Sequence, residues 1–257
     1  MKTVFLSTLA ALAFLSAASL RAAADPAADD LIAKGDVRDA KFQSNEALQC
    51  YLPAEKISPN NPALLTKISR QYRHLMTDDC PAAQKLRLGQ TAIAYAKRAA
   101  AAGPNDADAQ LSVAVSYGKT LPYLGTGDRI EACHMIKESA DKTLRLAPND
   151  DLAWHILGRW HRTLAEVSSL KRAVAQLAYG KLPSSTFEES ARCFEKAIEL
   201  NPNRLMHYVE LGKVYSEMGQ KDNARHFIDK GLAMKETEKD DPETKKEGRE
   251  LLAKLGS

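Results

Sequence analysis

The sequence predicts an all-α fold, an α-solenoid of about four helix pairs with a C-terminal capping helix. One observation is a spacing of large and small residues that occurs twice, in Trp154-x-x-Leu157-Gly158-x-x-His161 and Tyr208-x-x-Leu211-Gly212-x-x-Tyr215. Separations of three, four and seven residues place side chains on one stripe of a helix. A second observation is that each stretch is near a further helical seam, Ser190-x-x-x-Phe194-x-x-Ala197 or Ala224-x-x-x-Ile228-x-x-Gly231. A third is that the sequence lacks the apolar strand runs that a parallel sheet needs.

This pattern is typical of tetratricopeptide repeats, in which a large residue of one helix packs over a small residue of the next. Two weaker copies lie upstream: Leu65-x-x-Ile68-Ser69-x-x-Tyr72 with Ala92-x-x-x-Ala96-x-x-Ala99, and Gln110-x-x-Val113-Ala114-x-x-Tyr117 with Ile136-x-x-x-Ala140-x-x-Thr143. Each ends near a proline, and the next helix is expected to start on an Asn or Asp cap. The prolines Pro104, Pro148 and Pro202 lie 44 and then 54 residues apart. Because an unmodified repeat has about 34 residues, we expect expanded loops between the paired helices.

The predicted repeats are about 63–104, 105–148, 149–202 and 203–234, followed by a capping helix at about 242–255. Residues 25–62 are expected to be partly helical, with one helix around 40–51. The insert in the third repeat has a basic, helical centre near Lys171 and Arg172. After it, Thr186 and Glu189 have the spacing of a capping box that restarts a helix.

The first 24 residues predict a secretory signal peptide. Lys2 precedes the apolar run Val4–Leu20, and three alanines form an A-x-A exit before Asp25. A membrane anchor is the alternative, because about 17 apolar residues approach spanning length. The exit and the acids that follow it favour cleavage. We therefore expect an exported mature chain, periplasmic or extracellular if bacterial, with no transmembrane segment after signal cleavage.

A more specific resemblance rests on Leu157-Gly158-Arg159-Trp160, the basic insert, Pro183–Glu189, Phe194-Glu195-Lys196-Ala197 and Asn201-Pro202. With these residues the chain, from about 64 to 255, resembles the regulator of microtubule dynamics family, whose members are tetratricopeptide-like. The resemblance implies the solenoid fold and an association with microtubules and organelle contacts. For one branch it also implies tethering and phospholipid transfer. An exported bacterial protein would not meet tubulin, so the fold is the firmer implication.

Composition and motifs exclude several classes of function. The net charge is +3, and about +1 without the first 24 residues, which gives no footprint for nucleic-acid binding. No catalytic motif, cofactor motif or phosphate loop occurs, and Glu131-x-x-His134 lacks the second pair that a di-iron site needs. We therefore expect no enzyme activity, no cofactor and no metal. The four cysteines have no assignable pairing, and Cys133 and Cys193 fit buried thiols in helices.

The concave face is the candidate binding site. In each first helix, the residues about 100° from the packing stripe should line it, and many of them are basic. The candidate groove residues are Arg70, Arg73, His74, Lys119, His155, Arg159, Arg162 and Lys213. Arginine offers bidentate donors to carboxylate or phosphate. The alternative is a solvated face, or one paired internally with acids such as Glu217. Tyr72, Tyr117 and Trp160 fit the core better than a ligand site.

These residues suggest three functions. The leading hypothesis is a non-enzymatic scaffold that binds an acidic peptide or partner protein in a basic groove. The second is a phospholipid carrier, which predicts an apolar cavity behind the basic rim. The third is a structural protein whose end repeats stack into oligomers.

Overall fold

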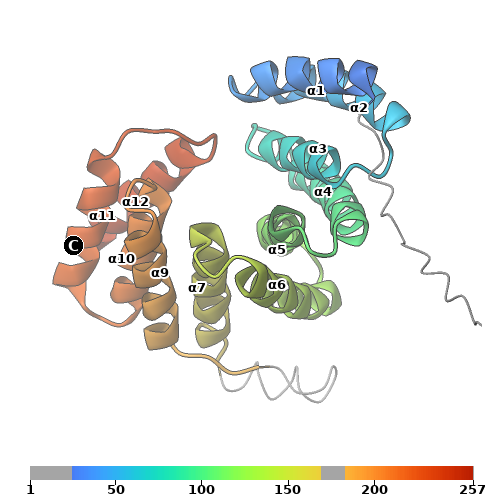
Figure 1. Ribbon diagram of the computed structural model, residues 1–257. Coiled ribbons are helices and arrows are strands. Elements are labelled where there is room, and N and C mark those ends of the chain that lie inside the picture. The colour runs from blue at the N-terminus through green and yellow to red at the C-terminus, as the bar shows by residue number, and fades with distance from the viewer. Residues whose placement is uncertain (1–24, 169–182, 257) are drawn as a thin grey trace, which may run out of the picture.

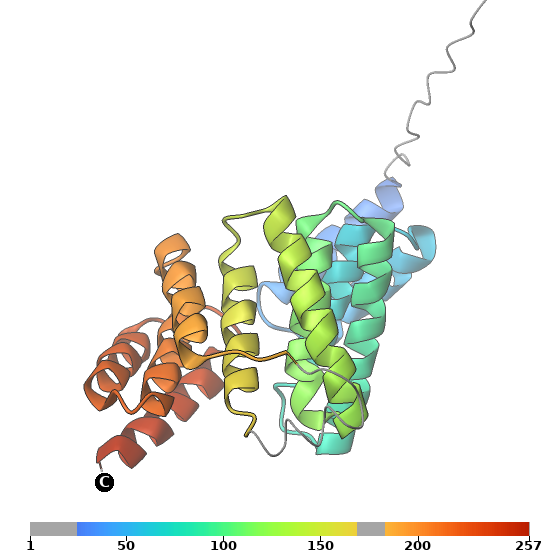
Figure 2. The same ribbon diagram turned by 90° about the horizontal axis from the view of Figure 1, so that it is seen from below.

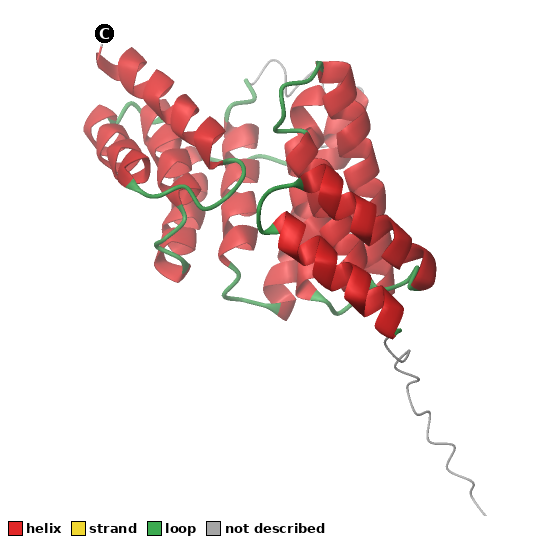
Figure 3. Ribbon diagram, turned by 90° about the horizontal axis from the view of Figure 1, so that it is seen from above, coloured by secondary structure: helices red, strands yellow, loops and turns green. Residues whose placement is uncertain are grey.

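The computed structural model describes residues 25–168 and 183–256, and every regular element within them is helical (Figures 1 and 3). The elements, in chain order, are α1 (Pro26–Asp39), α2 (Ser44–Ile57), α3 (Pro62–Leu75), α4 (Ala82–Ala102), α5 (Ala107–Thr120), the 3₁₀ turn η1 (Leu121–Tyr123), α6 (Thr126–Leu146), α7 (Asp151–Ala165), α9 (Phe187–Leu200), α10 (Leu205–Glu217), α11 (Lys221–Ala233) and α12 (Asp241–Gly256). The prediction of an all-α solenoid is confirmed.

The helices pack as successive pairs. Helix α1 contacts α2, α3 contacts α4, α5 contacts α6, α7 contacts α9, and α10 contacts α11, while α12 covers the last pair. Figure 2 shows the pairs side by side along the chain. The first helices of neighbouring pairs, α3, α5, α7 and α10, also contact one another in turn, so they form an inner layer. The second helices lie outside, and the whole array curves around that inner layer (Figure 1).

The large-over-small packing predicted from the sequence is present at both of the clearest repeats. A Cβ built on Gly158 would lie 2.8 Å from the Phe194 ring, and one on Gly212 would lie 2.5 Å from Ile228. Ser190 tightens the first contact, because its hydroxyl donates to the Gly158 carbonyl at 2.7 Å. The two helices of each pair therefore approach as closely as the backbone allows.

The helix starts follow the predicted caps, with one exception. The side chains of Asn61, Asp106 and Asp150 accept backbone N–H groups at the starts of α3, α5 and α7. The capping box of Thr186 and Glu189 is present at α9. The expected cap at the start of α10 is absent there, since Asn203 is not the cap and the Arg204 side chain makes no capping bond.

The N-terminal region holds a full fifth helix pair, α1 and α2, where one helix was expected. Its seam is Gly35 under Tyr51: a Cβ on Gly35 would lie 2.3 Å from the ring. The Tyr51 hydroxyl donates to Asp36 at 2.6 Å. The pair escapes the sequence pattern because α1 has Lys34 and Arg38 where the other first helices carry apolar or aromatic residues.

Two predictions concern residues outside the described part. The signal peptide at 1–24 and the helical centre of the insert, at 169–182, both lie there. Over the described ranges, the helices include none with the length and hydropathy required to cross a bilayer.

Candidate functional site

A groove of about 470 Å³ lies along the inner layer. Its walls come from α3, α5 and α7, the start of α10, and the segment between α11 and α12. Six of the eight candidate residues line it: Arg70, Arg73, His74, Lys119, His155 and Arg159. Their alignment follows from the repeat, since successive first helices present equivalent positions to the same face.

Arg73 is a buried cation held by hydroxyls. Its Nη1 donates to Ser69 at 3.0 Å, Ser112 at 3.1 Å and Ser116 at 2.9 Å. No carboxylate of the described residues lies within 4.0 Å of it. Burial lowers the pKa of Arg73 to about 10, with a further contribution from Arg70, so it stays charged at neutral pH. Its positive charge on the groove wall is therefore not neutralised by a contacting acid.

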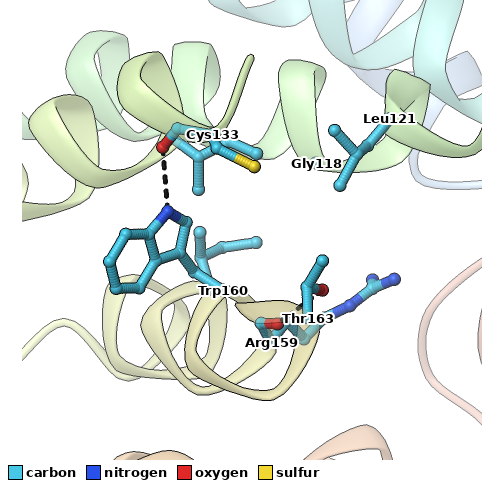
Figure 4. A pocket seen from close by; sticks show the side chains of 8 residues that line it. Gly118, Leu121, Cys133, Arg159, Trp160 and Thr163 are labelled. Atoms are coloured by element: carbon cyan, nitrogen blue, oxygen red, sulfur yellow. Dashed lines mark hydrogen bonds between the residues drawn. The ribbon is translucent and has the colours of Figure 1, made fainter. Parts of the chain in front are cut away.

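Arg159 is the second arginine of this kind. It is exposed, and within residues 25–168 and 183–256 it forms no ion pair. It also borders an apolar slot of about 40 Å³ between α5, α6 and α7, whose floor includes Cys133 and Trp160 (Figure 4). The Trp160 indole N–H donates to the Cys133 carbonyl at 2.8 Å, which fixes the slot wall. The slot and the groove share Ile156 and Arg159, so they adjoin.

The other four groove lysines and arginines have acidic partners. Arg70 pairs with the buried Asp39, and Lys119 pairs with Asp240 at 2.6 Å. Sequence reasoning missed Lys67 and Arg204, although Lys67 is one turn from Arg70. These two pair with Asp36 and with Asp151 and Glu238. The groove is thus less basic than the sequence predicts, because internal pairing accounts for most of its cations.

The two candidate histidines carry no charge at neutral pH. Burial lowers the pKa of His74 to about 4. Burial also lowers the pKa of His155 well below its usual value, and the neighbouring His207 adds to the effect. The two rings share a hydrogen bond of 2.9 Å between their Nδ1 atoms, and His207 bonds Asp151 at 3.0 Å through Nε2. Since the carboxylate fixes His207 with its proton on Nε2, His155 donates to His207.

Arg162 and Lys213 do not line the groove, so their assignment to it is wrong. Both turn to the buried Glu210, at 3.2 Å and 2.8 Å. Burial opposes ionisation of Glu210, but the attraction of the two cations outweighs it and holds the pKa of this carboxyl well below its ordinary value. The predicted acid, Glu217, is exposed instead.

The aromatic candidates and the cysteines belong to the packing. Tyr117 and Trp160 are buried, and Tyr72 stacks on Tyr95 with ring centroids 5.7 Å apart. Cys133 and Cys193 are buried as predicted, and all four cysteines are free thiols.

Acidic residues of one late segment also line the groove, and the sequence pattern did not indicate them. They are Glu238 and Asp240, which lie between α11 and α12 (Figure 1). The segment has no helical periodicity, and its partners are distant in sequence, with 163 residues between Asp240 and Thr77.

Comparison with protein families gives one match over nearly the whole chain. The family model described as regulator of microtubule dynamics protein 1-3 matches residues 27–256. Regulator of microtubule dynamics protein 1 of Mus musculus is 28% identical over 84% of this chain and 72% of its own length. Regulator of microtubule dynamics protein 2 of Homo sapiens is 27% identical over 74% of this chain, which spans 46% of that protein.

Solved structures with similar folds are tetratricopeptide proteins and related solenoids. A thermophilic tetratricopeptide protein of Thermus thermophilus has a TM-score of 0.63 at 16% identity, over 89% of this chain and 98% of its own. The pilF protein of Pseudomonas aeruginosa has a TM-score of 0.55 at 15% identity, over 90% of this chain and 89% of its own. At these identities the likeness shows the fold alone.

Proposed function

The chain belongs to the regulator of microtubule dynamics family, and from this membership and the groove we propose that it is a non-enzymatic scaffold that binds an acidic protein segment. The family resemblance carried by the third repeat is thereby confirmed, and it extends to the N-terminal pair. The proposal concerns the binding activity of the solenoid itself.

The observation that carries the proposal is the pair of arginines without acidic partners, Arg73 and Arg159, on one groove wall. A guanidinium that lacks a carboxylate has donors to offer a ligand, and arginine–carboxylate bonds are about twice as strong as neutral ones. Partly apolar surroundings, including Leu111, Val115 and Ile156, strengthen such a bond by limiting the water around it. The volume is in the range of sites that hold a ligand of a few residues' size.

The family name offers one source of an acidic partner, and the predicted export of the chain offers another. We propose export by residues 1–24, which would place the partner among periplasmic or extracellular proteins. The relatives are named for microtubule dynamics, so purified microtubules are a useful second probe.

Fluorescence anisotropy tests the proposal. The probe is a fluorescein-labelled decapeptide of alternating Glu and Ser, and its control has Gln at every Glu. We expect saturable binding of the acidic peptide alone, and a loss of about tenfold in affinity for Arg159→Ala, since a hydrogen bond to a charged group contributes about 1.5–3 kcal/mol. Arg192→Ala on the outer helix α9 removes the same charge away from the groove and should bind like the wild type.

Two results would overturn the proposal. One is no saturable binding of the acidic peptide up to millimolar protein. The other is binding that persists unchanged with the Gln peptide or with Arg159→Ala.

The phospholipid carrier gains no support from the described residues. The apolar slot behind Arg159 holds about 40 Å³, whereas small-molecule sites typically measure about 300–1,000 Å³. A mass spectrum with one phospholipid bound per chain would nevertheless favour the carrier over the peptide scaffold. The hypothesis of a structural oligomer stays a prediction, which sedimentation equilibrium tests.

A further inference from the structure

The segment Glu236–Asp241, here called the strap, is an acidic stretch that runs from the end of α11 back to the start of α12. At its base, the buried Asp241 carboxylate accepts the backbone N–H groups of Thr237 at 2.7 Å and Glu238 at 2.8 Å. These bonds fix the turn that presents the next acids. Figure 1 shows the strap reaching from the C-terminal pair toward the end of α3.

The tip of the strap is anchored beside the groove by residues that follow α3. The Thr77 hydroxyl donates to Asp240 at 2.6 Å, and Lys239 pairs with Asp78 at 2.8 Å. Neither Thr77 nor Lys239 lines the groove. They hold the strap in place without contributing to the groove wall.

Inside the groove, the strap supplies the carboxylates that neutralise two of its cations. Asp240 accepts from Lys119 through both oxygens at 2.6 Å, and Glu238 accepts from Arg204 at 2.9 Å. Burial raises the pKa of Asp240, but Lys119 and the Thr77 hydroxyl outweigh this and hold it below its usual value, so the carboxylate is charged. The chain thus shows how its own groove binds two carboxylates separated by one residue.

We infer that the strap is an internal competitor of the groove's ligand: the partner segment is an acid-x-acid sequence that displaces Glu238 and Asp240 from Arg204 and Lys119 and extends to Arg73 and Arg159. This inference rests on the proposed function and adds the partner's spacing and a built-in regulation. The strap's two carboxylates have the chemistry of the ligand, and they occupy the groove cations that would otherwise be free for it.

The strap is held by contacts suited to exchange. The side chains of Glu238 and Asp240 are each 43% exposed, and that of Asp78 is 49% exposed. Ion pairs with such exposure contribute little individually, so a ligand with more carboxylates can replace them. If the strap is docked in about 90–99% of molecules, it lowers the apparent affinity by about 10- to 100-fold.

The test uses the full chain with the double substitution Thr77→Val and Lys239→Gln, which removes the anchors of the strap and leaves the groove residues intact. The probe is a fluorescein-labelled peptide of the strap's own sequence, Glu-Thr-Glu-Lys-Asp-Asp, read by anisotropy. The variant has one positive charge fewer than the wild type, so charge alone predicts weaker binding of this acidic probe. Displacement of the strap predicts binding at least tenfold tighter. Lys196→Gln on α9 makes the same charge change at an exposed pair and should leave affinity unchanged.

The outcomes separate the two proposals. Tighter binding by the anchor variant supports the inference. Equal or weaker binding by a folded anchor variant, while the wild type binds, overturns the competitor and leaves the scaffold standing. No binding by either protein overturns the proposed function itself.

Hydrogen exchange gives an independent reading in the wild-type chain, which needs no variant to fold. A displaced strap predicts faster exchange of the amides of residues 237 and 238 when saturating probe is added. Slower exchange would mean that the strap closes over the ligand as a lid, and would overturn competition.

Discussion

Substitution of the glycine at the tightest part of the third repeat should destabilise the chain, while a glycine in the neighbouring repeat should tolerate the same change. In Gly158→Ala the new methyl would lie 2.8–2.9 Å from three atoms of the Phe194 ring. In Gly118→Ala the nearest atom is Ile156 Cδ1 at 3.9 Å, an ordinary contact, and the methyl enters the apolar slot. The two variants are matched, because both glycines lie within helices.

The expected magnitudes have opposite signs. Replacing a helical glycine with alanine gains about 1 kcal/mol of helix propensity at either position. At Gly158 the overpacking costs about 1–3 kcal/mol, which leaves a loss of up to about 2 kcal/mol. At Gly118 the gain of about 1 kcal/mol remains. For a chain of this size, 1 kcal/mol corresponds to about 2–4 °C in Tm.

Thermal unfolding followed by circular dichroism at 222 nm measures both. Gly118→Ala should raise Tm by about 2–4 °C, and Gly158→Ala should lower it by up to about 8 °C. Phe194→Leu in the Gly158→Ala background should cost less than in the wild type, since the smaller side chain relieves the overlap. An equal rise in Tm for both glycine variants would refute the packing described for this pair.

Three further predictions concern buried ionisable groups. Glu210→Gln should cost about 3 kcal/mol by urea titration, since it leaves two cations beside a neutral amide, and Glu199→Gln at an exposed pair should cost under about 0.5 kcal/mol; equal losses would contradict the buried network. The stabilisation from Glu210 is present above the carboxyl's unfolded pKa and should be lost as pH falls below about 4.3 toward its lower folded value. In NMR titration His74 should stay neutral at pH 6 and protonate near 4, since burial lowers its pKa to about 4, and a midpoint near 6.5 would place it in water. Burial raises the pKa of Cys193 to about 11 and that of Cys133 above its usual value, so a thiol reagent at pH 8 should modify both only after unfolding in guanidinium.

The sequence contains the fold because each repeat repeats its own packing rule. Gly158 and Phe194 stand at positions that recur along the chain, so the pairs and the inner face follow from spacing. The N-terminal pair could also have been found: Ala47-x-x-x-Tyr51-x-x-Ala54 has the same spacing as the third repeat's second helix, and Ser58-Pro59-Asn60 follows it. Only its first helix, with Lys34 and Arg38 at seam positions, departs from the pattern.

The charge of the site was not predictable to the same extent. Periodicity places His74, His155 and Arg73 on the inner face, but it does not report how deeply each is buried, and burial decides whether a histidine is charged. Glu210 lies three residues before Lys213, a local spacing that could have indicated their pairing. The strap is different, because no local pattern links Asp240 to α3.

The long-range contact between the strap and the end of α3 also bears on how the chain unfolds. A linear repeat array is held by nearest-neighbour contacts, so its terminal repeats fray while the middle stays folded. Here Asp240 and Thr77, separated by 163 residues, join the second and fifth pairs directly. Opening α10 and α11 must therefore also release α3, which makes loss of structure at one end a cooperative event for four of the five pairs.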